Sequence, residues 1–133
     1  MRHRKTIAKL NRPADHRRAL RKNLVASLLR HGQIKTVVSR AKVARALTER
    51  LLNDLKELSD FQRIRLLKKE LPADETASRR TLGEWLPLFL EKERTGVVRV
   101  TRLGFRKSDA AEMALVQIDL VKKNSSTPST PAK

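Results

Sequence analysis

The sequence predicts an α+β fold in which about four helices pack on a small antiparallel sheet, preceded by a basic, extended N-terminal arm. Three observations predict this fold. Apolar residues recur at helical spacing from residue 16 to about residue 85, they alternate at the two-residue period of strands after residue 96, and residues 1–14 show neither period. A chain of 133 residues with 39% hydrophobic content is sufficient for one small domain with a modest core.

Positive charge is concentrated at the start of the chain. The first fifty residues hold fifteen Lys or Arg and only two acidic residues, Asp15 and Glu49, so they carry +13 of the total +17. Residues 51–92 have no net charge, and residues 93–133 carry +4. Like charges oppose compaction, whereas a phosphate backbone neutralises them and releases its own counterions. The charge distribution therefore predicts a nucleic-acid partner for the N-terminal third.

The predicted arm covers residues 1–14. It holds five fixed positive charges and no acidic residue, and Pro13 disfavours a helix through it. We expect the arm to be extended and to become ordered only on binding.

A first helix is predicted from about residue 16 to residue 31. Asp15 is the expected N-cap, and Gly32 suits the left-handed position that closes a helix. The apolar stripe is formed by Leu20, Leu24, Val25, Leu28 and Leu29. The other face carries the cations Arg17, Arg18, Arg21 and Lys22.

An extended stretch over residues 33–38 separates this helix from a second one, for which Ser39 is the expected cap. The stripe of the second helix is Val43, Leu47, Leu51, Leu55 and Leu58. The basic residues that lie largely off this stripe are Arg40, Lys42, Arg45 and Arg50.

A third helix is predicted over residues 60–71 and is ended by Pro72. Its expected inward side chains are Phe61, Ile64, Leu67 and Leu71.

Asp74 is the expected cap of a fourth helix. Gly83 and Pro87 both disfavour a helix, so the sequence does not define where this one ends. Phe89 is expected in the core, and Trp85 fits either the core or a partner contact.

Alternation of apolar and polar residues then predicts a hairpin. Its apolar positions are Val98 and Val100 on the first strand and Ala114, Val116, Ile118 and Leu120 on the second. The loop over residues 104–111 carries Arg106 and Lys107 at its tip, and Phe105 faces either RNA or solvent. Residues 122–133 are rich in Ser, Thr and Pro and are expected to be disordered, which leaves a compact domain over residues 15–121.

Several classes of function lack support in the sequence. There is no cysteine, and His3, His16 and His31 are too scattered for a metal site. No nucleophile motif, Gly-rich phosphate loop or isolated carboxylate pair is visible. No apolar run approaches the roughly 20 residues that span a bilayer. We therefore predict a protein that is not an enzyme and has no cofactor, no membrane partner and no small-molecule substrate.

The kind of nucleic acid is less constrained by chemistry. Aromatic residues make up 3% of the chain, which disfavours single-strand readers that stack bases on aromatic platforms. The connection over residues 32–38 is longer than the turn of helix-turn-helix proteins, which disfavours a sequence-specific DNA reader. Compaction of DNA remains an alternative that charge alone permits.

Five segments of the chain carry a resemblance to a known family: MRHRK at residues 1–5, LNR at 10–12, HR at 16–17, SLLRHGQIKT at 27–36 and LGFRKSDAAEMA at 103–114. Together they resemble the bacterial-type large-subunit ribosomal protein family number seventeen, collinearly from Met1 to about Val121. A family-like start at Met1 argues against a removed presequence, such as the organelle transit peptide that an Arg-rich start also fits. Residues 52–93 match mainly in their apolar pattern, and the chain lacks the double glycine and aromatic that often precede the first hairpin strand in the family.

The resemblance implies a structural component of the large ribosomal subunit, bound to ribosomal RNA and to neighbouring large-subunit ribosomal proteins near the rim of the nascent-chain exit. It also implies that a short strand over residues 33–37 joins the hairpin. The implied location is the cytoplasmic ribosome, with an organellar ribosome left open. Charge and resemblance together give the expected RNA-binding residues: Arg2, His3, Arg4, Lys5, Lys9, Asn11, Arg12, His16, Arg17, Arg18, Arg21, Lys22, Arg30, His31, Lys35, Arg40, Lys42, Arg45, Phe105, Arg106 and Lys107.

Overall fold

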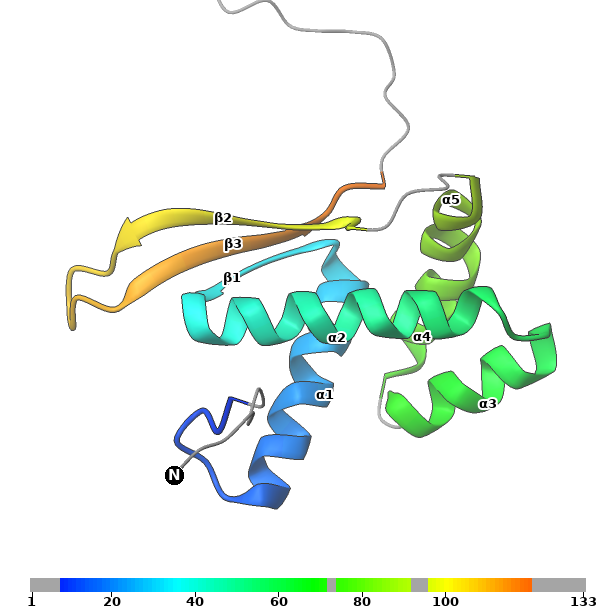
Figure 1. The fold of residues 1–133 in the computed structure, drawn as a ribbon, viewed down its shortest axis with the longest axis horizontal. Coiled ribbons are helices and arrows are strands. Elements are labelled where there is room, and N and C mark those ends of the chain that lie inside the picture. The colour runs from blue at the N-terminus through cyan, green and yellow to red at the C-terminus, as the bar shows by residue number, and fades with distance from the viewer. Residues whose placement is uncertain (1–7, 72–73, 92–95, 121–133) are drawn as a thin grey trace, which may run out of the picture.

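The computed structural model describes residues 8–71, 74–91 and 96–120, in which helices pack against one face of a three-stranded antiparallel sheet (Figure 1). The elements are α1 (Ala14–His31), β1 (Gln33–Val37), α2 (Val38–Lys56), α3 (Asp60–Glu70), α4 (Glu75–Arg80), the π-helical turn η1 (Thr81–Trp85), α5 (Leu86–Glu91), β2 (Val98–Phe105) and β3 (Glu112–Ile118). Because α4, η1 and α5 follow one another without a break, we call residues 75–91 the α4–α5 helix. The predicted α+β fold with about four helices on a small antiparallel sheet is confirmed. The tail over residues 122–133 lies outside the described residues.

Helix α1 begins earlier than predicted, and the expected cap is wrong. Its first residue is Ala14, and the carbonyl of Pro13 accepts the Arg17 N–H at 2.9 Å. Proline suits a helix start because it has no N–H to leave unsatisfied, so Asp15 falls inside the first turn without capping it. The other end matches the prediction, because Gly32 is left-handed with φ of 76° and donates to the Leu28 carbonyl at 2.8 Å.

Helix α2 follows β1 with no connecting residue, so the prediction that Ser39 caps it is wrong. Val37 still pairs with Met113 of β3 and is extended, and the helix begins at Val38. Sheet pairing therefore fixes the chain up to the helix and places Ser39 within its first turn. The buried face is shifted from the predicted stripe and consists of Val38, Ala41, Ala44, Thr48, Leu51, Leu52 and Leu55.

Helix α3 contributes only one end to the core. Leu67 and Leu71 are buried as predicted, but Phe61 and Ile64 are exposed, so the expected inward position of these two residues is wrong. The reason is that α3 lies at the edge of the helical layer (Figure 1), where the rest of the described fold does not enclose these two side chains.

The α4–α5 helix shows how the chain accommodates a proline in mid-helix. Asp74 caps it as predicted, because its carboxylate accepts the Ala77 N–H at 2.9 Å. In the wider π turn the Leu86 N–H donates to the Thr81 carbonyl, just before Pro87, which has no N–H to donate. The helix continues to Glu91, and both Trp85 and Phe89 are buried in the core.

The strands lie in the order β1-β3-β2, so β1 joins the hairpin as the resemblance implies. Gln33 pairs with Gln117, and Val98 pairs with Ile118. The pairing shifts between Arg102 and Gly104, which leaves Leu103 as a bulged residue. Strand β2 is longer than predicted and runs to Phe105, whereas β3 ends at Ile118, short of the predicted Leu120, so residues 106–111 connect the two strands.

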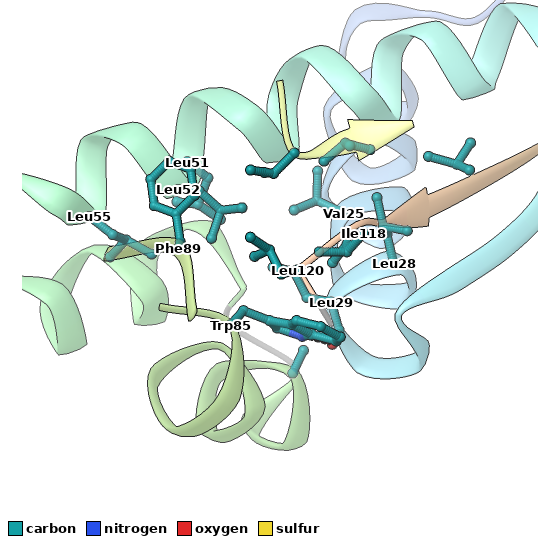
Figure 2. Packing of buried hydrophobic residues seen from close by; sticks show 14 of the residues in the cluster. Val25, Leu28, Leu29, Leu51, Leu52, Leu55, Trp85, Phe89, Ile118 and Leu120 are labelled. Carbon is teal, nitrogen blue, oxygen red and sulfur yellow. Dashed lines mark hydrogen bonds between the residues drawn. The ribbon is translucent and has the colours of Figure 1, made fainter. Parts of the chain in front are cut away.

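The core lies where α1, α2 and the α4–α5 helix meet the sheet (Figure 2). Its fully buried side chains include Leu28 and Leu29 of α1, Leu52 and Leu55 of α2, and Leu120 after β3. The Trp85 indole N–H donates to the Leu29 carbonyl at 2.8 Å, which satisfies the one polar atom of the ring in this apolar surrounding.

Candidate nucleic-acid interface

The described part of the predicted arm is a turn in front of α1. Leu10 and Asn11 are both left-handed, with φ of 53° and 52°, and the Arg12 N–H donates to the Lys9 carbonyl at 3.2 Å. The side chains of Lys9, Asn11 and Arg12 line an open hollow of about 430 Å³. Two cations and an amide thus surround one small hollow. Arg2, His3, Arg4 and Lys5 lie outside the described residues.

The first turns of α1 continue this basic surface. His16 and Arg18 are exposed and Arg17 is half-buried. Arg21 and Lys22 are half-buried and already make contacts, because Arg21 Nη2 donates to the Ala8 carbonyl at 3.3 Å and Lys22 Nζ donates to the Lys69 carbonyl at 2.7 Å. These two side chains hold the N-terminal turn and α3 against α1.

A second group of cations lies where β1 passes into α2. Lys35 and Lys42 are exposed, and Arg40 is half-buried. Arg45 is 3.4 Å from Glu49 and forms a pair one helical turn apart. In Figure 1 this junction and the tip of the hairpin lie toward the left of the view, while α1 begins at the bottom.

The hairpin tip is bare on both faces. Every residue from 101 to 110 is exposed, and Phe105 retains 76% of its accessible surface. Arg106 donates two hydrogen bonds to the Asp109 carboxylate, from Nε to Oδ1 at 2.8 Å and from Nη2 to Oδ2 at 2.5 Å. The hydrogen bond from Arg106, together with the Ala111 N–H, lowers the pKa of Asp109 to about 2. Arg106 therefore shapes the loop, while Phe105 and Lys107 face outward.

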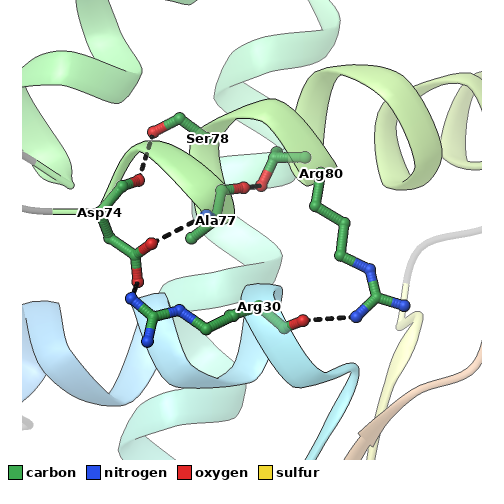
Figure 3. A network of polar contacts seen from close by, with 6 residues as sticks. Arg30, Asp74, Ala77, Ser78 and Arg80 are labelled. Atoms are coloured by element: carbon green, nitrogen blue, oxygen red, sulfur yellow. Dashed lines mark hydrogen bonds and ion pairs between the residues drawn. The ribbon is translucent and has the colours of Figure 1, made fainter.

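Arg30 lies at the other end of α1, about 20 Å from Arg17 at the helical rise per residue. Its Nη2 is 2.5 Å from Asp74 Oδ2, and its carbonyl accepts a hydrogen bond from Arg80 (Figure 3). Burial alone raises the pKa of Asp74, but hydrogen bonds from Arg30 and the Ala77 N–H, with the charges of Arg30 and His31, bring it below its ordinary value. Arg30 thus joins α1 to the cap of the α4–α5 helix, and the structure does not place Arg30 and His31 with the other predicted cations.

Sequence reasoning missed part of the hairpin. Arg99 pairs with Asp119 at 2.9 Å and Arg102 pairs with Glu112 at 3.2 Å, so the strands carry cations as well as the loop. Bulged Leu103 is also exposed. The available signal was the loss of alternation after Val100, which shows that this part of the strand has no buried face.

Within the described ranges, no three His, Cys, Asp or Glu residues gather where they could hold a metal ion. None of the helices there is long and apolar enough to cross a membrane.

The fold is a small α+β scaffold that presents exposed basic side chains on its N-terminal turn, the first turns of α1, the β1–α2 junction and the hairpin. The model of the family "Ribosomal protein L17" matches residues 20–119. The chain belongs to the ribosomal protein L17 family, a family of structural proteins and not of enzymes.

Three relatives illustrate the match, each carrying the name "Large ribosomal subunit protein bL17". The protein of Dictyoglomus turgidum is 39% identical over 117 residues, which cover 88% of this chain and 98% of the relative. That of Myxococcus xanthus is 36% identical over 118 residues, or 89% of this chain and 83% of the relative. That of Thermotoga neapolitana is 36% identical over 124 residues, which cover 89% of this chain and 94% of the relative. The similarity therefore spans the whole fold.

Proposed function

We propose that this chain is a structural component of the large ribosomal subunit and that it binds ribosomal RNA through the N-terminal turn, the first turns of α1, the β1–α2 junction and the hairpin tip. The observation that carries the proposal is the charge distribution, with +13 in the first fifty residues and no net charge in residues 51–92. A folded domain sustains such an imbalance most readily when phosphates lie against it.

The contacts of the described residues divide the expected RNA-binding set into two roles. Lys9, Arg12, Arg18, Lys42 and Lys107 are exposed, and their side chains have no hydrogen-bond or ion-pair partner among the described residues. Their charged groups are therefore available for phosphate oxygens.

The second role is internal. Arg21, Lys22, Arg30, Arg45 and Arg106 already bind carbonyls or carboxylates of the protein. In this proposal they fix the positions of the loop, the helices and the hairpin on which the first set is presented, so that RNA meets a surface already in place.

The mechanism is charge neutralisation without chemistry. Bringing RNA segments together costs phosphate repulsion, which positioned cations offset, while released counterions favour binding entropically. This role fits subunit assembly and translation in a cytoplasmic ribosome, with neighbouring ribosomal proteins near the nascent-chain exit. It requires no cofactor, membrane or small-molecule substrate.

The test is the salt dependence of binding to large-subunit ribosomal RNA. Arg12→Gln, Arg18→Gln and Lys42→Gln should each lower the slope of log K against log salt by about 0.7–0.9, the value for one lost phosphate contact. The matched control is Arg79→Gln. Arg79 is an exposed cation that pairs with Glu75, and it lies in residues 51–92, which have no net charge. If removal of residues 1–12 left both affinity and slope unchanged, the N-terminal contribution would be refuted.

Duplex DNA is the competing partner, because charge alone also permits DNA compaction. Competition between structured ribosomal RNA and duplex DNA separates the two, and a preference for the duplex contradicts the proposal. Co-sedimentation with the large subunit after a high-salt wash tests the cellular partner directly.

A further inference from the structure

An apolar patch remains uncovered on the side of the molecule formed by α3 and the α4–α5 helix. Phe61 and Ile64 of α3 and Leu90 of α5 are 69%, 45% and 42% exposed. Phe61 and Ile64 are three residues apart and share one face of α3. Together with half-buried Leu82, these residues form what we call the α3–α5 patch.

The patch is hollowed and not flat. One hollow of about 350 Å³ is lined by Ile64, Leu82, Leu86, Pro87 and Leu90, with Asp60 and Arg63 at its rim. A second hollow of about 490 Å³ is lined by Ile64, Leu67, Leu71 and Leu82 among others. Because Ile64 and Leu82 line both, the two hollows are neighbours between α3 and the α4–α5 helix. A contiguous exposed apolar surface of this kind on a small soluble protein marks an interaction site.

Among the described charged residues that line the two hollows, only Lys68 has no ion-pair partner. Asp60 is 2.6 Å from Arg63 and Glu75 is 2.7 Å from Arg79, so these carboxylates are neutralised within the chain. Lys68 lines the second hollow, and Arg65 lies over the Phe61 ring at 5.0 Å from its centroid. Neither cation has a carboxylate partner among the described residues.

Several occupants fit this surface poorly. Ribosomal RNA is drawn to excess positive charge, but residues 51–92 have none in sum, and apolar side chains cannot satisfy its phosphates. A second copy of this chain brings another +17 against the first. The C-terminal tail offers no row of apolar residues, because Val121 is the only large aliphatic residue in 121–133.

We propose that the α3–α5 patch docks another protein of the large subunit, through a segment that presents an apolar ridge flanked by carboxylates. The ridge fills the hollows over Ile64 and Leu82 and covers Phe61, and the carboxylates meet Arg65 and Lys68. This inference rests on the proposed function, and it assigns two surfaces of the molecule to different partners, RNA to the hairpin and basic turns and protein to the outer face of α3.

The experiment places the photo-crosslinking amino acid p-benzoylphenylalanine at position 61 of the full chain, within purified large subunits. Position 105 at the hairpin tip is the matched control, since it is also an exposed phenylalanine. We expect position 61 to crosslink to another protein, at a peptide that contains apolar and acidic residues, and position 105 to crosslink to RNA. Crosslinks from position 61 to RNA, to a second copy of the chain or to nothing overturn the inference.

A paired variant, Ile64→Ser with Lys68→Glu, tests the chemistry of the contact. Lys68 is exposed and Ile64 is 45% exposed, so the thermal unfolding midpoint should fall only slightly and the salt slope of RNA binding should stay unchanged, while the protein crosslink from position 61 falls about tenfold or more. An unchanged crosslink yield contradicts the docking surface. Failure of the chain to co-sediment with large subunits refutes the proposed function instead, whereas co-sedimentation without a protein crosslink refutes only this inference.

Discussion

Asp74 links α1 to the α4–α5 helix, and its replacement should measurably lower the free energy of unfolding. Asp74→Ala removes the cap hydrogen bond to the Ala77 N–H and the ion pair with Arg30. Loss of a cap costs about 1 kcal/mol. The charged hydrogen bond adds about 1 kcal/mol, below the usual range, because the Arg30 side chain is 46% exposed and water replaces its lost partner. The expected loss in the free energy of unfolding is therefore about 2 kcal/mol.

Thermal or urea denaturation measures this loss. For a domain of this size, about 2 kcal/mol corresponds to a drop in Tm of roughly 6–10 °C. Asp74→Asn is the matched control, because asparagine caps helices as well as aspartate but carries no charge, so it should lose only about half as much.

Two results would refute the reasoning. Equal losses for Asp74→Asn and Asp74→Ala mean that the cap contributes nothing. The ion pair is refuted if Arg30→Met costs the same in the Asp74→Asn background as in the unaltered protein, because a double-mutant cycle then shows no coupling.

The ion pair also predicts a pH dependence. The pKa of Asp74 is lower in the folded chain than its ordinary 3.8, so its charge stabilises the fold above about pH 4 and this part is lost as the pH falls through the folded value. The stability difference between the unaltered protein and Asp74→Asn should shrink below that pH. A difference that stays constant from neutral to acidic pH contradicts a role for the charge.

Three further predictions follow from single residues. Gly32→Ala should cost about 1–2 kcal/mol in unfolding experiments, because φ is 76° and the new Cβ would lie 3.3 Å from the Trp85 ring; an unchanged Tm refutes it. Thr48→Val should stabilise the fold by about 1 kcal/mol, because the Thr48 hydroxyl is buried without a partner in the described structure; a loss of stability would mean that it has one. Arg106→Gln should move the pKa of Asp109 from about 2 toward 3.8 in an NMR titration, whereas an unmoved value denies the contact.

Local signals were predictable from the sequence wherever a residue acts through its own backbone or nearest turn. Gly32 closes α1 and Asp74 caps the α4–α5 helix as expected, because left-handed freedom and a short carboxylate act within a few residues. The prediction that Ser39 caps α2 was wrong because pairing with a strand almost eighty residues away controls where α2 begins. The prediction that Asp15 caps α1 was wrong because Pro13 sets the start of this helix.

Apolar periodicity has a different limit, since it shows that a helix has an apolar face but not what covers it. Phe61 and Ile64 satisfy the pattern and are nevertheless exposed, because α3 lies at the edge of the fold. For the candidate interface, charge indicated which segments carry exposed cations, and their contact with RNA stays a prediction. The difference between cations free for a partner, such as Arg18, and cations held internally, such as Arg30, depends on tertiary contacts that no pattern shows.

The strand order β1-β3-β2 has a consequence for the folding of the chain during its synthesis. Synthesis runs from the N-terminus at roughly 5–20 residues per second, so β3, the middle strand, is made last and β1 waits several seconds for its only neighbour. Until then β1 and β2 have no sheet to join, and the carbonyl of Gly32 lacks the Ile118 N–H that reaches it at 2.9 Å. A nascent chain that ends before β3 therefore lacks both strand pairs of the sheet, which form only when the last strand has been made.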